Sequence, residues 1–219
     1  DADTAAGSWT TAPLFSKIDE VTADASDEIT SETLIIAGST SIAKISLTPL
    51  IDPVSARLSA AVYSSLSKSI GTEETSPQDV FFKSDGTKMY VLGLVNDTIY
   101  QYSLSTAWDV STATYDVVFK SVSAQETNPR GVFFKSDGTK MYVVGTTNDT
   151  VYQYTLSTPW VVSSATYDSV SKSVSAEDTN PNGVFFKSDG TKMYVAGDTN
   201  DTVYQYSLSS AWDLSTASY

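Results

Sequence analysis

The sequence predicts an all-β protein made of small four-stranded sheets that stack against one another, and three observations predict it. The segment VFFKSDGTKMYV begins at Val80, Val132 and Val184, which gives a period of 52 residues. Within each repeat, short apolar runs alternate with the turn signals Asp-Gly and Asn-Asp. Large apolar side chains also occupy both alternating sets of positions in these runs, which predicts sheets covered on both faces.

The second repeat illustrates the first pair of strands. Gly131–Lys135 is rich in β-forming residues, and Lys140–Gly145 follows after a short turn. Asp137 and Gly138 lie in that turn, where glycine accepts the positive φ that tight hairpins require. The sequence therefore predicts an antiparallel hairpin in every repeat.

Two further strands complete the predicted unit. Thr150–Leu156 follows the Asn148-Asp149 turn and places Tyr152, Tyr154 and Leu156 on one face. After the connection Ser157–Ser164, residues Ala165–Val174 alternate in the manner of an outer strand with one wet side. Helix signals are missing from the repeats, so each unit is predicted to hold four strands.

A single unit of this kind buries too little apolar surface to fold alone. Units with large side chains on both faces must lie between similar units, and about 50 residues per four-stranded unit is typical of β-propeller blades. We therefore predict an all-β fold with three propeller-type blades in residues 61–219, preceded by a small β-rich segment. A β-trefoil, which also has three four-stranded repeats, is the alternative.

Three blades are fewer than the four to eight of a closed propeller. The segment Ala61–Thr75 matches the outer strand that the third repeat lacks, because Ala217-Ser218-Tyr219 contains only the beginning of that strand. We therefore expect a homo-oligomer in which two chains exchange strands to close a six-bladed ring. A longer chain that supplies further blades would also solve the closure problem.

Residues 1–60 carry no repeat and are interpreted as an attachment or docking segment. Leu34–Ile36 and Ile42–Leu47 flank Gly38-Ser39-Thr40 and predict a hairpin, and Pro13–Val21 is compatible with a short helical turn.

The composition excludes several classes of protein. The 26 acidic and 13 basic residues give a net charge of −13, which repels a nucleic-acid backbone. The chain has no cysteine and no histidine, so disulfides, thiol nucleophiles, Ser-His-Asp triads and ordinary zinc sites are excluded. No apolar run is long enough to span a bilayer, so we expect neither nucleic-acid partners nor membrane insertion.

The repeat also resembles a known family pattern. Asn-Pro-x-Gly-Val-x-Phe-x-x-Asp-Gly-Thr-Lys-x-Tyr-Val occurs as Asn128–Val143 and Asn180–Val195, and in altered form as Ser76–Val91. It resembles the blade motif of YVTN-type and lactonase-like β-propellers, and implies the fold rather than an activity. The first copy departs from the motif because Asp79 replaces glycine. The longer string through NDTVYQYTLSTPW is similar to repeats in tail or surface proteins of marine phages and their hosts.

Repeated residues are interpreted mainly as structural. Asp85, Asp137 and Asp189 occupy the same turn position in three copies, which favours turn chemistry over a catalytic carboxylate pair. The lysines on both sides of these turns are expected to keep the hairpin edges soluble. We therefore predict no catalytic residue, no metal site and no cofactor.

Binding positions are sought where the repeats differ or expose aromatic rings. Gln78, Arg130 and Asn182 differ where inner strands begin, and Leu94, Thr146 and Asp198 differ beside the second hairpin. Trp108, Trp160 and Trp212 recur before the fourth strand, where indole rings stack on sugars or pack against the blades. These nine residues are the candidate binding set.

The function expected from these features is non-enzymatic. Nearly identical acidic repeats suit a structural and binding protein displayed on a virion or cell surface, such as a phage appendage or decoration, with several equivalent loops for contacts with glycans or surface proteins. A bacterial surface adhesin is a second interpretation. A lactonase-like hydrolase, in which acidic residues surround a central metal, is the third.

Overall fold

The computed structural model describes residues 33–37, 42–46 and 63–219 of the chain. The chain divides into two compact units, Asp1–Tyr63 and Ser64–Tyr219. In the first unit, β1 (Thr33–Ala37) pairs antiparallel with β2 (Ile42–Ser46), as the apolar runs predicted. The predicted helical turn at Pro13–Val21 and the rest of residues 1–60 lie outside the described residues.

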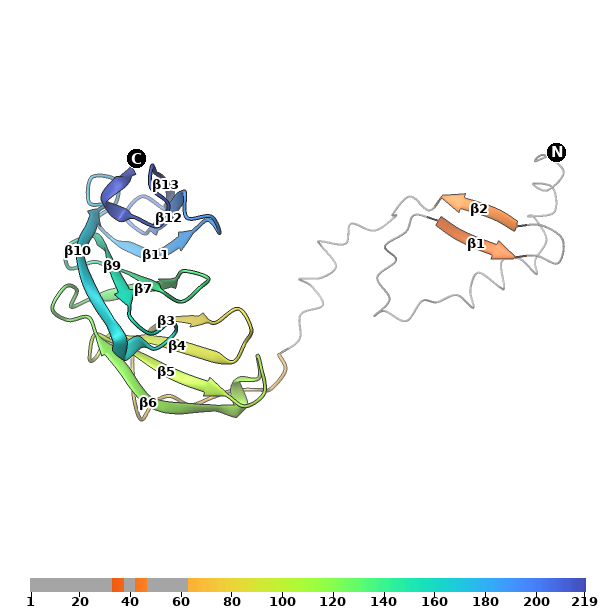
Figure 1. Cartoon of the computed structure of the whole chain (residues 1–219), viewed down its shortest axis with the longest axis horizontal. Coiled ribbons are helices and arrows are strands. Elements are labelled where there is room, and N and C mark those ends of the chain that lie inside the picture. Colours follow the sequence, from red (N-terminus) through yellow and green to blue (C-terminus); the bar gives the residue numbers. More distant parts are fainter. Residues whose placement is uncertain (1–32, 38–41, 47–62) are drawn as a thin grey trace. The chain divides into compact units, whose positions relative to one another are not determined.

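The second unit consists of three four-stranded antiparallel sheets, the predicted propeller-type blades, and does not form the alternative β-trefoil (Figure 1). Blade 1 contains β3 (Pro77–Phe82), β4 (Lys88–Gly93), β5 (Thr98–Leu104) and β6 (Ala113–Ser121). Blade 2 contains β7 (Pro129–Phe134), β8 (Lys140–Gly145), β9 (Thr150–Leu156) and β10 (Ala165–Ser173). Blade 3 contains β11 (Pro181–Phe186), β12 (Lys192–Gly197), β13 (Thr202–Leu208) and the short β14 (Ala217–Ser218).

In each blade, one 3₁₀ turn lies directly before the outer strand. These turns are η2 (Val110–Thr112), η3 (Val162–Ser164) and η4 (Leu214–Thr216). Within the described residues, no helix has the length and apolar character needed to cross a membrane.

The hairpin between β7 and β8 shows why its glycine is required. Gly138 has φ of +73°, and a Cβ at this position would lie 2.5 Å from the Trp160 ring. The indole therefore packs directly on the turn, which a side chain at 138 would prevent. Asp137 accepts hydrogen bonds from the backbone N–H and the hydroxyl of Thr139, which is the predicted turn chemistry.

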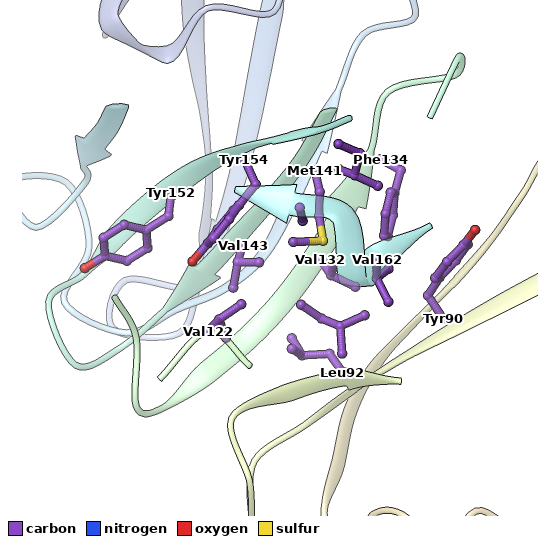
Figure 2. Packing of buried hydrophobic residues seen from close by; sticks show 13 residues of the cluster. Tyr90, Leu92, Val122, Val132, Phe134, Met141, Val143, Tyr152, Tyr154 and Val162 are labelled. Atoms are coloured by element: carbon purple, nitrogen blue, oxygen red, sulfur yellow. The ribbon is translucent and has the colours of Figure 1, made fainter. Parts of the chain in front are cut away.

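Neighbouring blades share apolar cores. Tyr90 and Leu92 of blade 1 pack with Val132, Phe134 and other residues of blade 2 in one buried cluster (Figure 2). An equivalent cluster joins blade 2 to blade 3. Blade 2 thus presents one face to blade 1 and the other to blade 3, because both of its faces carry large side chains.

Hydrogen bonds cross the same junctions at equivalent positions. The Tyr90 hydroxyl donates to the Trp160 carbonyl at 2.8 Å, and the backbone N–H of Val162 donates to Oε1 of Gln101 at 3.1 Å. Burial raises the pKa of Tyr90 well above its ordinary value, so this hydroxyl stays protonated and serves as a donor. Every junction is therefore fixed by polar contacts as well as by apolar area.

Candidate functional site

The three innermost strands lie side by side, so their first residues gather at one place. A Cβ built on Gly131 would lie 3.1 Å from Cα of Gly183 and 3.2 Å from the carbonyl oxygen of Asn182. Glycine at 131 therefore permits β7 and β11 to approach closely. Blade 1 carries Asp79 at the equivalent position, and its side chain reaches across to blade 2.

Asp79 is a partly buried carboxylate held by two backbone groups. Its Oδ1 accepts from the N–H of Val80 and its Oδ2 from the N–H of Val132, both at 2.8 Å. Burial raises the pKa of Asp79 above its ordinary value, against the effect of these two hydrogen bonds. Each oxygen keeps a further lone pair, so Asp79 can also accept a proton from a third group.

Arg130 on blade 2 contacts Gln78, the residue before Asp79, across the same junction. Its Nη1 donates to Oε1 of Gln78 at 2.8 Å, and its Nε is buried without a hydrogen-bond partner among the described residues. Gln78 and Arg130 are 52 residues apart in sequence, and the structure brings these two predicted binding residues into contact. The guanidinium retains N–H donors for an additional acceptor.

Gln78, Asp79 and Lys68 are the polar residues that line a hollow of about 420 Å³ on blade 1. The remaining lining is apolar and comes from Ile70, Pro77, Val80, Met89, Val91 and Val110. A carboxylate with a raised pKa, an arginine with unused donors and an adjoining concave surface are the elements of a site for acid–base chemistry on a polar substrate.

The segment before Arg130 is fixed by a buried acid. Oε1 of Glu126 accepts from the backbone N–H groups of Asn128 and Thr147 at 2.8 and 3.0 Å. A Cβ on Gly145 would lie 2.4 Å from Cδ of Glu126, so that glycine leaves the space which the carboxylate occupies. The start of β7, and with it Arg130, is positioned by this contact.

The other candidate binding residues at the strand starts and second hairpins are exposed or make local contacts. Asn182 is exposed at the start of β11. Thr146 and Asp198 accept hydrogen bonds from Asn128 and Asn180, and the backbone N–H of Leu94 donates to the Ser76 carbonyl. These contacts connect the beginning of an inner strand to the second hairpin.

The three tryptophans pack on the Asp-Gly turns of their own blades. Trp212 is 9% exposed and stacks on Phe133 and Phe186, and Trp160 is half-buried against Phe134. Trp108 remains 58% exposed. Two of the rings therefore lie in blade junctions and only Trp108 presents a large open surface.

The repeated turn aspartates form local ion pairs with the preceding lysine. Lys135 Nζ lies 2.7 Å from Oδ2 of Asp137. Although partial burial raises the pKa of Asp137, hydrogen bonds from Lys135 and Thr139 lower it to about 2. The same pairing recurs at Asp85 and Asp189.

The lactonase interpretation includes a central metal held by acidic residues. The described residues do not provide such a set of ligands. Among the residues that the structure describes, no three histidine, cysteine, aspartate or glutamate side chains gather where they could hold a metal ion. No catalytic step is therefore assigned to a metal.

Comparison with known proteins identifies one family. A family profile described as "Lactonase, 7-bladed beta-propeller" matches residues 30–217 of the 219-residue chain. None of the curated proteins matches the chain significantly.

Solved structures give weaker likenesses. A candidate 6-phosphogluconolactonase from Bacteroides uniformis is 12% identical, with a TM-score of 0.49, and covers 65% of this chain and 39% of its own. A protein from Lactobacillus plantarum is 16% identical, with a TM-score of 0.47, and the match covers 65% of this chain and 39% of that protein. The periplasmic gluconolactonase of Pseudomonas aeruginosa is 14% identical, with a TM-score of 0.46, and the match covers 60% of this chain and 35% of that protein. The chain spans less than two fifths of each of these structures, and likenesses at this level say nothing about its activity.

The family match overturns two expectations from the sequence. The non-enzymatic role on a virion or cell surface is wrong, and so is the conclusion that the protein is no enzyme, because the match assigns the blades to a family of lactonases. Nearly identical repeats favour residues that are equivalent in all blades, whereas Asp79 is specific to blade 1. It stands where the blade motif has glycine, and it is not among the nine candidate binding residues.

Proposed function

We propose, from the premise that this chain belongs to the lactonase family with a seven-bladed β-propeller, that it takes part in the hydrolysis of cyclic esters. The observation that carries this proposal is Asp79, a partly buried carboxylate with a raised pKa at the start of β3, next in sequence to Gln78, which accepts a hydrogen bond from Arg130. A lactone lacks a net charge at its ring, so the strongly acidic surface of the chain does not oppose its approach.

The residues have the properties that ester hydrolysis requires. Asp79 in its ionised form takes a proton from a water molecule, and the water oxygen attacks the carbonyl carbon of the lactone. Unused N–H donors of Arg130 then stabilise the negative charge that develops on the carbonyl oxygen. When the ring C–O bond breaks, the proton held by Asp79 passes to the departing alkoxide oxygen, so lactone and water give one hydroxy acid.

In this proposal Gln78 keeps Arg130 in place, because its Oε1 accepts a hydrogen bond of 2.8 Å from the guanidinium. The amide N–H₂ group of Gln78 donates to the carbonyl and hydroxyl oxygens of Ser76, which fixes the Gln78 side chain at the start of β3.

The proposal is tested by following acid release from simple γ- and δ-lactones with the purified chain. Asp79→Asn should lower the rate at least about 100-fold, because a general base contributes a factor of this order. Asp137→Asn removes the same charge from a turn aspartate and should leave the rate unchanged. Absence of turnover by the unaltered chain, or full activity of Asp79→Asn, would contradict the proposed role.

A further inference from the structure

Glu126 carries a buried carboxylate oxygen without a partner at the start of blade 2. The residue is fully buried, and its Oε1 accepts hydrogen bonds from the backbone N–H groups of Asn128 and Thr147. Its Oε2 is also buried but has no hydrogen-bond donor among the described residues. Burial of a charged oxygen without a partner is costly. The Oε2 atom therefore has room in its bonding for a further electropositive group.

Two other buried oxygens without partners belong to the same part of blade 2. Asp149 lies in the turn between β8 and β9, two residues after Thr147, and its Oδ1 is unpartnered among the described residues. The Oδ1 atom of Asn128 is also unpartnered, while its Nδ2 donates to the hydroxyl of Thr146 in that turn. The carboxylates of Glu126 and Asp149 and the amide of Asn128 are thus all held at one short turn.

The carboxylates at this turn repel one another. Burial raises the pKa of Asp149 above its ordinary value, and the charges of Glu126 and Asp178 raise it further. Burial and the charges of Glu126 and Glu74 raise the pKa of Asp97 on blade 1 in the same way. Each ion pair between described residues joins a lysine to some other aspartate, so none of these pairs neutralises the group. Water satisfies a lone pair but does not compensate the charge.

The backbone of the turn does not account for an aspartate. Asp149 has φ of 47°, a left-handed conformation that asparagine adopts as readily as aspartate. An asparagine would remove the repulsion, and its amide N–H₂ group would be able to donate to the unpartnered oxygen of Glu126. The charge at position 149 therefore opposes folding unless a positive charge lies beside it.

Blade 3 has the same acidic position without an unpartnered oxygen. Asp178 replaces the glutamate, and its Oδ1 accepts from the N–H groups of Asn180 and Thr199 at 2.8 and 3.4 Å. Its Oδ2 accepts from the N–H of Asn200 at 3.3 Å. The shorter side chain uses both oxygens on backbone donors, whereas the longer Glu126 uses only one. The unpartnered oxygen is therefore a property of glutamate at this position and not of the repeat as a whole.

Blade 1 resembles blade 2 only in part. Oε2 of Glu74 and Oδ1 of Asp97 are buried without partners among the described residues. Ser76, however, stands where blade 2 has Asn128, and its hydroxyl accepts from the side chain of Gln78. Only blade 2 therefore combines two carboxylates with an amide oxygen.

We propose that blade 2 binds Ca²⁺ at this turn, with Oε2 of Glu126, Oδ1 of Asp149 and Oδ1 of Asn128 as its protein ligands. Ca²⁺ accepts carboxylate and amide oxygens in flexible geometry, whereas Mg²⁺ requires a nearly octahedral shell and keeps several of its waters. Water molecules complete the shell of the bound ion. Two carboxylates balance the charge of one divalent cation, so binding removes the repulsion at the turn.

The bound ion joins the start of β7 to the turn between β8 and β9. Arg130 follows Glu126 by four residues, so the ion stabilises the segment that positions this arginine. The sequence-based expectation of no metal site considered the Asp-Gly turns, which lie elsewhere in the blade. The site uses two carboxylates at a turn, unlike a central metal held by a larger acidic set. The inference does not depend on the proposed hydrolytic activity.

The experiment measures thermal unfolding of the 219-residue chain after treatment with EDTA and transfer into CaCl₂, MgCl₂ or NaCl of equal ionic strength. About 10 mM Ca²⁺ should raise Tm by at least about 3 °C, because an ion that binds only the folded state stabilises it by mass action. Mg²⁺ should have less than about half of this effect. Isothermal titration calorimetry should give a Kd of about 10⁻⁴–10⁻³ M, since few charged ligands contribute.

Two variants with matched controls test the ligands. Glu126→Asp introduces the residue that blade 3 accommodates and should abolish the rise in Tm with Ca²⁺. Glu74→Asp makes the same change in blade 1 and should retain the rise. Asp149→Asn keeps the left-handed turn and should also abolish the rise, whereas Asp201→Asn at the equivalent position of blade 3 should retain it.

Each variant is compared with itself in the presence and absence of Ca²⁺, so a change in its basal stability does not obscure the result. Circular dichroism verifies that the blades are folded. No rise in Tm for the unaltered chain, an equal rise with Mg²⁺ or NaCl, a rise that survives in Glu126→Asp or Asp149→Asn, or its loss in both controls would each overturn the proposal.

Discussion

The carboxylate of Asp168 on the outer strand of blade 2 accepts a hydrogen bond of 2.8 Å from Nε2 of Gln153. Oε1 of the same amide accepts from the backbone N–H of Leu214 on blade 3 at 2.9 Å. Asp168 also accepts from Thr155 and forms an ion pair with Lys140 at 3.2 Å. An acidic residue at the outer rim thereby orients the amide that joins two blades.

Asp168→Asn is expected to lower the free energy of unfolding by about 1–2 kcal/mol at neutral pH, because hydrogen bonds to a charged acceptor are replaced by weaker ones. Although burial raises the pKa of Asp168, the hydrogen bonds from Gln153, Thr155 and Lys140 lower it below its ordinary value of 3.8. The stabilisation is therefore complete above about pH 4 and is lost as the pH falls through the lowered folded pKa. Urea unfolding at several pH values measures this difference.

The matched control for this prediction is Asp201→Asn, which removes the same charge from an exposed turn residue that also tolerates asparagine at its positive φ. It should change the unfolding free energy by less than about 0.5 kcal/mol. A difference between Asp168→Asn and the unaltered chain that persists at acidic pH would contradict the assigned role of the carboxylate.

Tyr142→Phe is expected to destabilise the domain by about 1–2 kcal/mol, because it leaves the buried carbonyl of Trp212 without its donor at 2.7 Å. The phenyl ring retains the apolar contacts, so the denaturant dependence of unfolding should not change. Tyr63→Phe, at a residue that is 73% exposed, provides the control and should be neutral. Equal stability of the two variants would show that the junction does not need this hydrogen bond.

Gly138→Ala is expected to cost more than about 2 kcal/mol, since the left-handed backbone alone costs about 1–2 kcal/mol for a residue with a Cβ. The added methyl group must also displace the Trp160 ring, which lies 2.5 Å from the Cβ position. Thermal unfolding and the near-ultraviolet signal of tryptophan should both change. Gly71→Ala meets its nearest atom only at 3.8 Å and should remain close to the unaltered protein.

The proposed role of Asp79 predicts how lactone hydrolysis depends on pH. A general base acts when it is ionised, so kcat/KM should rise with pH through the pKa of Asp79. Burial raises that pKa, so the midpoint is expected above the ordinary value of 3.8. A rate profile recorded with the unaltered chain measures this midpoint, and a midpoint below 3.8 would exclude Asp79 as the base.

Arg130→Gln should reduce kcat for the lactone by about 100-fold while leaving the fold intact, because it removes the positive charge that faces the developing oxyanion. Glutamine at this position is similar to Gln78 and Asn182 at the equivalent positions, which the blades accommodate. Rates measured at saturating lactone separate this effect from weaker binding. An unchanged kcat would remove Arg130 from the proposed mechanism.

The amino-acid sequence by itself determined the strands, the turns and the three blades of residues 61–219. Alternating apolar residues and the Asp137-Gly138 turn act over a few residues, so the hairpin of β7 and β8 was predictable from local rules. The period of 52 residues then predicted three equivalent sheets, and the structure contains them. The resemblance to lactonase-like propellers was also visible in the blade motif.

Only the tertiary structure decided which residues meet across the blades. Gln78 and Arg130 are 52 residues apart, and no local pattern indicates that their side chains form a hydrogen bond. Asp79 appeared in the sequence as an irregularity of one repeat, and its contact with the backbone of Val132 exists because stacked blades bring the innermost strands together. Burial between those blades also changes the chemistry of its carboxylate, because desolvation depends on surroundings that the neighbouring residues in sequence do not specify.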